Sequence, residues 1–185
     1  MSWSPLRPRP GRQEPARGFW AWLDAFARAA LPPVATALLL VLVATFRGAP
    51  ALVSAVVLPA VFFWSIFRPL SMSPVAVFCL GLLQDLVTYA PLGIGILSLL
   101  AVHGLAFRWR RALAGWSFLA VWVVFCGFAA GAAGLGWLLY AILSLRLPPP
   151  EPSLQFALLA AGLYPTLAYL MTGAHSAMRQ AELEA

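Results

Sequence analysis

One acidic residue, Asp85, lies near the middle of a long apolar run that spans residues 74–93. The only other acidic residue within 31–172 is Glu151, which belongs to a proline-rich connector. A carboxylate at membrane depth costs a few kcal/mol, so such residues are paired and usually functional. The sequence leaves two readings open for Asp85: a functional acid, or a structural residue that is hydrogen-bonded inside a helix bundle.

The residues around Asp85 predict a helix with one small and polar face. Ser73 followed by proline predicts its start, because serine caps helix N-termini and proline suits the first helical position. Gly81, one turn before the carboxylate, would let a neighbouring backbone approach closely. We expect the face of Asp85 to point at protein rather than lipid, and its other members are Pro74, Phe78, Gly81 and Thr88.

The depth of Asp85 limits its partners within the chain. It lies eleven residues from the start of the predicted helix, about 16 Å from the cytoplasmic end. Arg68 and His103 are too shallow to reach it, whereas Ser98 lies at about the same depth. We expect Asp85 to be protonated and hydrogen-bonded to Ser98 or other hydroxyl groups, since an unpaired charge there would be neutralised. A basic group from another chain is the competing partner.

The sequence lacks the residue patterns of the common enzyme classes. It contains no glycine-rich phosphate loop and no GxSxG nucleophile elbow. His103 and His175 have no cysteine or carboxylate nearby at metal-ligand spacing. The basic N-terminal tail lacks the flanking fold of a nucleic-acid reader. We therefore expect a protein without enzymatic activity, cofactor, metal or nucleic-acid partner.

The composition predicts an all-α integral membrane protein. Hydrophobic residues make up 62% of the chain and charged residues 10%, with a mean hydropathy of +0.87. A membrane span needs about 17–25 apolar residues. Six transmembrane helices are predicted at 31–46, 51–67, 74–90, 93–107, 116–145 and 153–172.

Arginine placement orients the predicted spans. All twelve basic residues are arginine, and with both termini cytoplasmic only Arg47 and Arg146 fall on the opposite side. This bias follows the positive-inside rule and supports six spans with both termini cytoplasmic. The cytoplasmic arginines of this topology are Arg7, Arg9, Arg12, Arg17, Arg28, Arg68, Arg108, Arg110, Arg111 and Arg179.

Two of the predicted elements have unusual lengths. Residues 74–107 are too few for two full spans and a turn, so we expect a short helical hairpin whose outer turn lies at or below the membrane surface. Residues 116–145 are too many for one straight span, so this helix should tilt, break or project from the bilayer.

The predicted domain plan has three parts. Residues 1–30 form a basic cytoplasmic tail and an interfacial helix, 31–173 form the six-helix membrane domain, and 174–185 form a short cytoplasmic tail. The interfacial helix carries an Asp24–Arg28 pair at i,i+4 spacing. It is either a lipid anchor or a docking site for a cytoplasmic partner.

A stripe of small residues lies within 116–145. Its members follow i, i+3, i+4, i+7 spacing, and they are Gly127, Ala130, Gly131 and Gly134. Such stripes let helices pack closely. The stripe either packs inside the same bundle or contacts another protein.

The motif around Asp85 resembles the signature of the rod shape-determining protein MreD family. The matching pattern is Pro74-x3-Phe78-x2-Gly81-Leu82-x2-Asp85-x5-Pro91-Leu92-Gly93, preceded by Arg68-Pro69. It covers about 26 of the 185 residues, and the length and hydropathy of the chain are also similar to that family. Nothing is carried over to the residues before about 31, because the long Arg/Pro-rich extension departs from the family.

The resemblance implies a non-enzymatic, multi-pass scaffold of the bacterial cell-elongation machinery in the cell inner membrane. Such a subunit would bind the bitopic protein MreC and, through it, the MreB filament, the RodA glycosyltransferase and its transpeptidase. Membrane lipid and a second copy of the chain are further candidate partners.

The MreD family is also similar in fold to the substrate-binding subunits of energy-coupling-factor transporters. That similarity implies an alternative function, the capture of a small, vitamin-like molecule. The clearest ligand-binding side chains for it are Thr45, Tyr89 and Tyr140, and a weak Ala25-x3-Ala29 spacing resembles the docking motif of those subunits.

Overall fold

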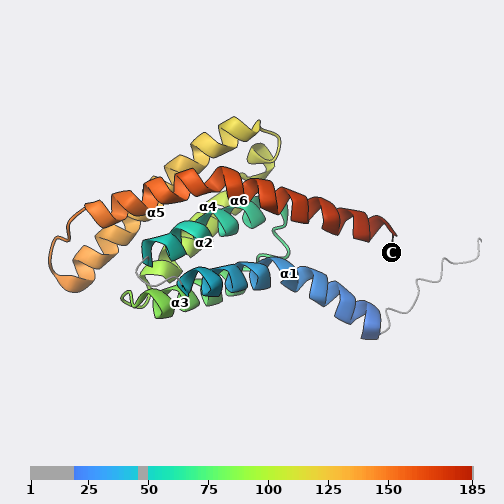
Figure 1. Ribbon diagram of the computed structural model, residues 1–185, viewed down its shortest axis with the longest axis horizontal. Coiled ribbons are helices and arrows are strands. Elements are labelled where there is room, and N and C mark those ends of the chain that lie inside the picture. Colours follow the sequence, from blue (N-terminus) through green and yellow to red (C-terminus); the bar gives the residue numbers. More distant parts are fainter. Residues whose placement is uncertain (1–18, 46–49, 185) are drawn as a thin grey trace, which may run out of the picture.

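The computed structural model describes residues 19–45 and 50–184, which form six helices joined by short connections, with no strand among them (Figure 1). The all-helical class is therefore confirmed for this part of the chain. The helices are α1 (Phe19–Ala44), α2 (Pro50–Phe67), α3 (Pro74–Thr88), α4 (Ile94–Leu113), α5 (Phe118–Ser144) and α6 (Glu151–Glu184). The predicted tail at 1–18 and Arg47 lie outside the described residues.

Serine caps set the starts of two helices. Ser73 Oγ accepts a hydrogen bond of 3.2 Å from the backbone N–H of Ala76, with proline at the next position, as the sequence predicts for α3. Ser117 Oγ does the same for Ala120 at the start of α5. Both helices end at a residue in the left-handed conformation, Tyr89 after α3 and Leu145 after α5.

The N-terminal helix differs from the prediction. We expected a short interfacial helix followed by a separate span, but α1 is one helix that continues through Pro32 and Pro33. The hydroxyl of Thr36 donates a 2.8 Å hydrogen bond to the carbonyl of Pro32. Figure 1 shows α1 changing direction along its length, as prolines inside a helix favour. The side chains of Ala25, Ala29 and the Asp24–Arg28 pair lie outside the described residues.

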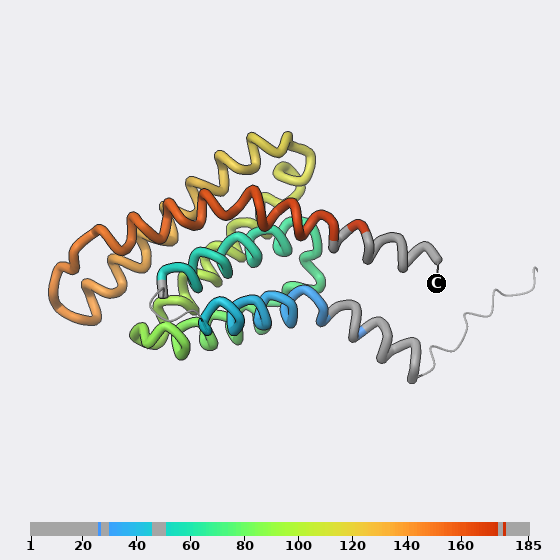
Figure 2. The backbone as a smooth tube through the Cα atoms, viewed as in Figure 1, coloured from blue at the N-terminus to red at the C-terminus, as the bar shows by residue number. Residues whose placement is uncertain are grey.

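Helix α2 lies at the centre of the fold. It contacts all the other helices and runs between them in Figure 2. Its residues from Val53 to Ile66 are almost entirely buried. The ring of Phe62 packs against three aromatic rings from α5 and α6 at centroid distances of 5.0–5.9 Å, those of Phe125, Phe128 and Tyr164. Edge-on and tilted ring pairs of this kind add to the area that each ring buries.

The observed lengths of the α3–α4 hairpin and of α5 agree with the predictions in their main features. Helix α3 has 15 residues, about 22 Å, and turns directly into α4, as the short-hairpin prediction requires. Helix α4 continues to Leu113, six residues beyond its predicted end at 107. Helix α5 is unbroken over 27 residues, and its connection to α6 extends beyond the α3–α4 turn in Figure 1. Helix α6 continues through 174–184, where we expected a short tail.

Two helices of the described chain are long and apolar enough to cross a membrane, namely α5 and the part of α6 from Glu151 to Gly173. Only 33% and 28% of their apolar windows are buried inside the molecule. A core helix of a soluble protein would be mostly buried, so these helices present apolar faces outward. Shorter apolar helices cover Ala30–Ala44, Ala51–Phe67 and Pro74–Thr88.

Candidate functional site

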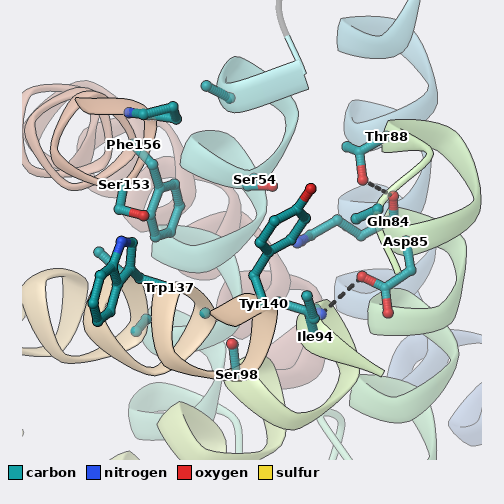
Figure 3. Close-up of a pocket in the computed structure, with 17 residues that line it drawn as sticks. Ser54, Gln84, Asp85, Thr88, Ile94, Ser98, Trp137, Tyr140, Ser153 and Phe156 are labelled. Carbon is teal, nitrogen blue, oxygen red and sulfur yellow. Dashed lines mark hydrogen bonds between the residues drawn. The ribbon is translucent and has the colours of Figure 1, made fainter. Parts of the chain in front are cut away.

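Asp85 joins the two helices of the hairpin through its carboxylate. Its Oδ2 accepts a 2.8 Å hydrogen bond from the backbone N–H of Gly93. Its Oδ1 accepts one of 2.8 Å from the backbone N–H of Gly95, which Figure 3 marks with a dashed line. The residue is 1% exposed. Both donors belong to the first turn of α4, where backbone N–H groups have no partner inside their own helix. Asp85 therefore caps α4 from α3.

The expected bond between Asp85 and Ser98 is wrong. Ser98 Oγ is buried and has no hydrogen-bond partner, whereas α4 begins close enough for its first N–H groups to reach the carboxylate. Both oxygens instead accept hydrogen bonds from backbone N–H groups at the N-terminus of α4. A basic group from another chain would find the carboxylate already bonded and closed off from the surface.

Two glycines make this approach possible. A Cβ atom on Gly81 would lie 2.6 Å from Cα of Ile96, so the backbones of α3 and α4 are in direct contact there. This confirms the predicted close approach at Gly81. A Cβ atom on Gly95 would collide with Oδ1 of Asp85. Side chains at these positions would push α4 away and separate the carboxylate from its donors.

The Pro91-Leu92-Gly93 segment forms the turn between the helices. Gly93 has a φ of 109°, which residues with a side chain rarely adopt, and its N–H is one of the two donors to Asp85. Pro91 and Leu92 are exposed, and the carbonyl of Pro91 accepts from the N–H of Ile94 at 3.3 Å. The structure thus brings together Gly81, Asp85 and Gly93 of the predicted site.

No family model matches this chain, and neither a curated protein nor a solved structure does. The resemblance to MreD proteins stays a prediction that rests on the motif residues quoted above.

Other motif residues lie apart from this cluster. Arg68 and Pro69 are in the α2–α3 turn at the opposite end of α3, where the carbonyl of Arg68 accepts hydrogen bonds from the N–H groups of Ser71 and Met72. Both residues are half-buried. This part of the motif shapes the turn that leads into α3 and does not contact Asp85.

The predicted protein-facing side of α3 is partly wrong. Pro74 and Phe78 are exposed, with Phe78 at 45%. The buried stripe of α3 is rotated from the predicted face and consists of Val77, Leu80, Gly81, Gln84 and Asp85. The stripe is buried because α3 packs on α4, α1 and α2, and these contacts cover only one side of the helix.

The small stripe of α5 does not pack inside the molecule. Gly127, Ala130, Gly131 and Gly134 are exposed, and a Cβ atom on any of the three glycines would meet nothing within 4 Å. The first of the two interpretations of the stripe, packing within the bundle, is therefore wrong for the described residues. Gly127 and Gly131 instead line a groove of about 360 Å³ between α4 and α5, together with Leu105, Trp109 and other apolar side chains.

A cavity of about 430 Å³ lies beside the Asp85 cap and is lined from α2, α3, α4, α5 and α6. Tyr140, one of the predicted ligand-binding residues, lines it (Figure 3). Thr45 and Tyr89 do not: the Thr45 hydroxyl donates to the carbonyl of Leu42, and Tyr89 is 95% exposed. Our sequence reasoning missed Gln84, although a second polar residue next to Asp85 in an apolar run was a usable signal.

Proposed function

We propose that the protein is a non-enzymatic, six-span scaffold of the bacterial inner membrane, similar to MreD. In this role it binds MreC directly and, through MreC, connects MreB filaments to RodA and its transpeptidase. Its function is then to keep cells rod-shaped by holding the wall-synthesis complex together.

The arrangement of the helix ends supports the six-span topology. In Figure 1 the α2–α3 turn, the α4–α5 turn and the end of α6 lie at one end of the molecule, and the α3–α4 and α5–α6 connections lie at the other. Arg68 and the Arg108–Arg111 cluster belong to the first end, and Arg146 belongs to the second. With the arginine-rich end in the cytoplasm, this distribution follows the positive-inside rule.

The observation that carries the scaffold proposal is the outward-facing glycine stripe of α5. No described residue covers it, and it opens into the apolar groove between α4 and α5. Small residues let a second backbone approach closely in lipid, where association depends on packing rather than on the hydrophobic effect. The single membrane span of a bitopic protein such as MreC is an occupant of suitable shape and polarity.

Substitution of the stripe tests this proposal. We expect Gly131→Leu to reduce the recovery of MreC with the detergent-solubilised protein by about tenfold or more, since a bulky side chain would separate the helices. Cells that depend on this variant should become round. Gly162→Leu is the matched control, because Gly162 is exposed on α6 and equally free of neighbours. Equal recovery of MreC with both variants would contradict the proposal.

One observation favours the alternative function, a small-molecule-binding subunit of a transporter. This observation is the cavity beside Asp85, which lies at the end of the molecule that carries few arginines. Copurification of an ATPase component in place of MreC would favour this alternative over the scaffold.

A further inference from the structure

We propose that the cavity beside Asp85 binds a small, uncharged molecule that carries an N–H or O–H donor on a flat, amide-like group. The proposal goes beyond the scaffold function and does not depend on it. It rests on the polar atoms, the rings and the charges that line the cavity.

The polar wall of the cavity has two atoms without a partner. Among the described residues, the only buried side-chain oxygen or nitrogen atoms that lack a hydrogen bond are Oε1 of Gln84 and Oγ of Ser98. Both residues line this cavity, Ser98 also lines the α4–α5 groove, and Gln84 is 8% exposed. A buried polar atom without a partner costs about 1–3 kcal/mol. Oε1 is almost inaccessible to solvent, so a ligand donor reaches it when the Gln84 amide turns toward the cavity, and the new hydrogen bond then removes this cost.

Gln84 and Ser98 are placed by the same hairpin that Asp85 closes. The amide nitrogen of Gln84 lies against Gly95, where a Cβ atom would be 3.0 Å from it. Ser98 follows Gly95 by three residues and so shares its side of α4. Asp85 also lines the cavity, but both of its oxygens already accept hydrogen bonds from the α4 backbone. The cavity therefore offers neutral polar groups rather than a free carboxylate.

The facing wall is aromatic. Trp137 and Tyr140 of α5 and Phe156 of α6 line it opposite Gln84 and Asp85 (Figure 3). The indole N–H of Trp137 donates a 3.0 Å hydrogen bond to the carbonyl of Pro148, which holds that ring in place. Aromatic walls with a few fixed polar groups are typical of small-molecule sites, whose volumes run from about 300 to 1,000 Å³. Ring faces of this kind suit a flat ligand.

The charge of the lining excludes an anion. None of the described residues that form the cavity is an arginine, and the chain contains no lysine. An anion in this apolar space would lose its hydration without gaining a counter-charge. These constraints leave a neutral molecule with a donor as the ligand class.

Three probes of one shape and different charge test the proposal. Benzamide is neutral with an N–H donor, benzoate is its anion, and benzamidine is its cation. We expect the full chain, purified in detergent, to bind benzamide saturably in ligand-observed NMR and calorimetry, and both charged probes at least about tenfold more weakly. Tighter binding of benzamidine, equal binding of all three, or no binding of benzamide would each overturn the proposal.

Variants then locate the binding. Gln84→Leu removes the unpartnered acceptor and should weaken benzamide binding about tenfold, the size of one lost hydrogen bond. Gln155→Leu is the matched control, because Gln155 is exposed on α6 outside the cavity, and it should bind normally. Ser98→Ala removes the second unpartnered atom with little loss of volume, and this variant should bind benzamide several-fold more weakly. It provides a second test of the site should Gln84→Leu fail to fold. Unchanged affinity in the folded Gln84 and Ser98 variants would overturn the proposal.

Discussion

At Asp85 both carboxylate oxygens accept hydrogen bonds from backbone N–H groups that lie eight and ten residues further along the chain. This bonding connects the end of α3 to the start of α4 across a turn of a few residues. A buried carboxylate is tolerated because the N-terminus of a helix supplies both donors and a favourable dipole. The sequence left a functional and a structural reading open, and the geometry gives Asp85 a structural role.

Asp85→Asn tests that role. Asparagine keeps one acceptor oxygen, so either Gly93 or Gly95 would lose its partner and face an amide N–H instead. Hydrogen bonds to charged groups contribute about 1.5–3 kcal/mol, and we expect the free energy of unfolding to fall by about 2 kcal/mol in SDS titration of mixed micelles. Since Asp85 is 1% exposed, the folded fraction should keep the proposed binding to MreC.

The control for this prediction is Glu151→Gln, the same change of charge at an exposed residue of the first turn of α6. There we expect a loss of no more than about 0.5 kcal/mol. Equal losses in the two variants would contradict the hydrogen-bond account, and a folded Asp85→Asn variant without MreC binding would restore the functional reading.

At the scale of residues, the sequence showed that a buried carboxylate at Asp85 is energetically costly, but it did not show which groups donate hydrogen bonds to it. Asp85 could be singled out because a lone carboxylate in an apolar run needs an explanation. Its donors could not be found by examining side chains, because they are backbone groups whose position depends on where α4 begins. Gln84 escaped notice for a related reason: its importance comes from the missing partner of Oε1, which only the packed structure reveals.

At the scale of the elements, the α3–α4 contact depends on small residues at one crossing point. The backbone of Ile96 lies where a Cβ atom on Gly81 would have to be. Gly81→Ala should therefore separate the helices and lower the free energy of unfolding by about 1–3 kcal/mol, as overpacking does. The same unfolding titration measures it.

Gly104→Ala is the matched change on α4, because Gly104 is exposed and a Cβ atom there would meet nothing within 4 Å. Alanine favours the helix over glycine by about 0.8–1.0 kcal/mol, so this variant should be as stable as the parent or more stable. A Gly81→Ala protein that is as stable as the Gly104→Ala protein would refute the contact.

Spacing along a helix predicts which residues share a face but not which way that face points. Gly81 and the glycines of α5 are all small residues in apolar helices and predict close helix packing in the same way. In the structure, however, Gly81 contacts α4 and Gly131 faces outward. In a soluble protein the apolar side would settle the direction. Here α5 is apolar on all sides, so the small stripe alone could not distinguish a neighbour in the fold from a separate partner.

At the scale of the whole molecule, the helical class of the described residues was predictable, and so were the bounds of α2, α3 and α5 to within about two residues, because apolar length and proline or serine at the helix starts mark them. Helices α4 and α6 continue past their predicted ends, because a helix can extend beyond the apolar segment that the prediction counted. Helix α1 differs as well, since a proline pair suggested an interruption and the helix continues through it. The proposed topology rests on a further inference from arginine placement: Arg68 belongs to the α2–α3 turn and the Arg108–Arg111 cluster to the end of α4. Figure 1 shows these two turns at the same end of the molecule.

Cysteine labelling checks this topology in a protein whose two native cysteines, Cys79 and Cys126, have been replaced by alanine. A cysteine at position 147, in the exposed α5–α6 connection, should react with a membrane-impermeant maleimide in intact cells. A cysteine at the exposed Gly115, in the α4–α5 turn, should react only after the inner membrane is permeabilised. The two turns lie at opposite ends of α5, whose 27 residues extend about 40 Å and exceed the 30 Å of hydrocarbon. Equal labelling of both positions in intact cells would refute a span at α5, and reversed labelling would place the arginine-rich end outside.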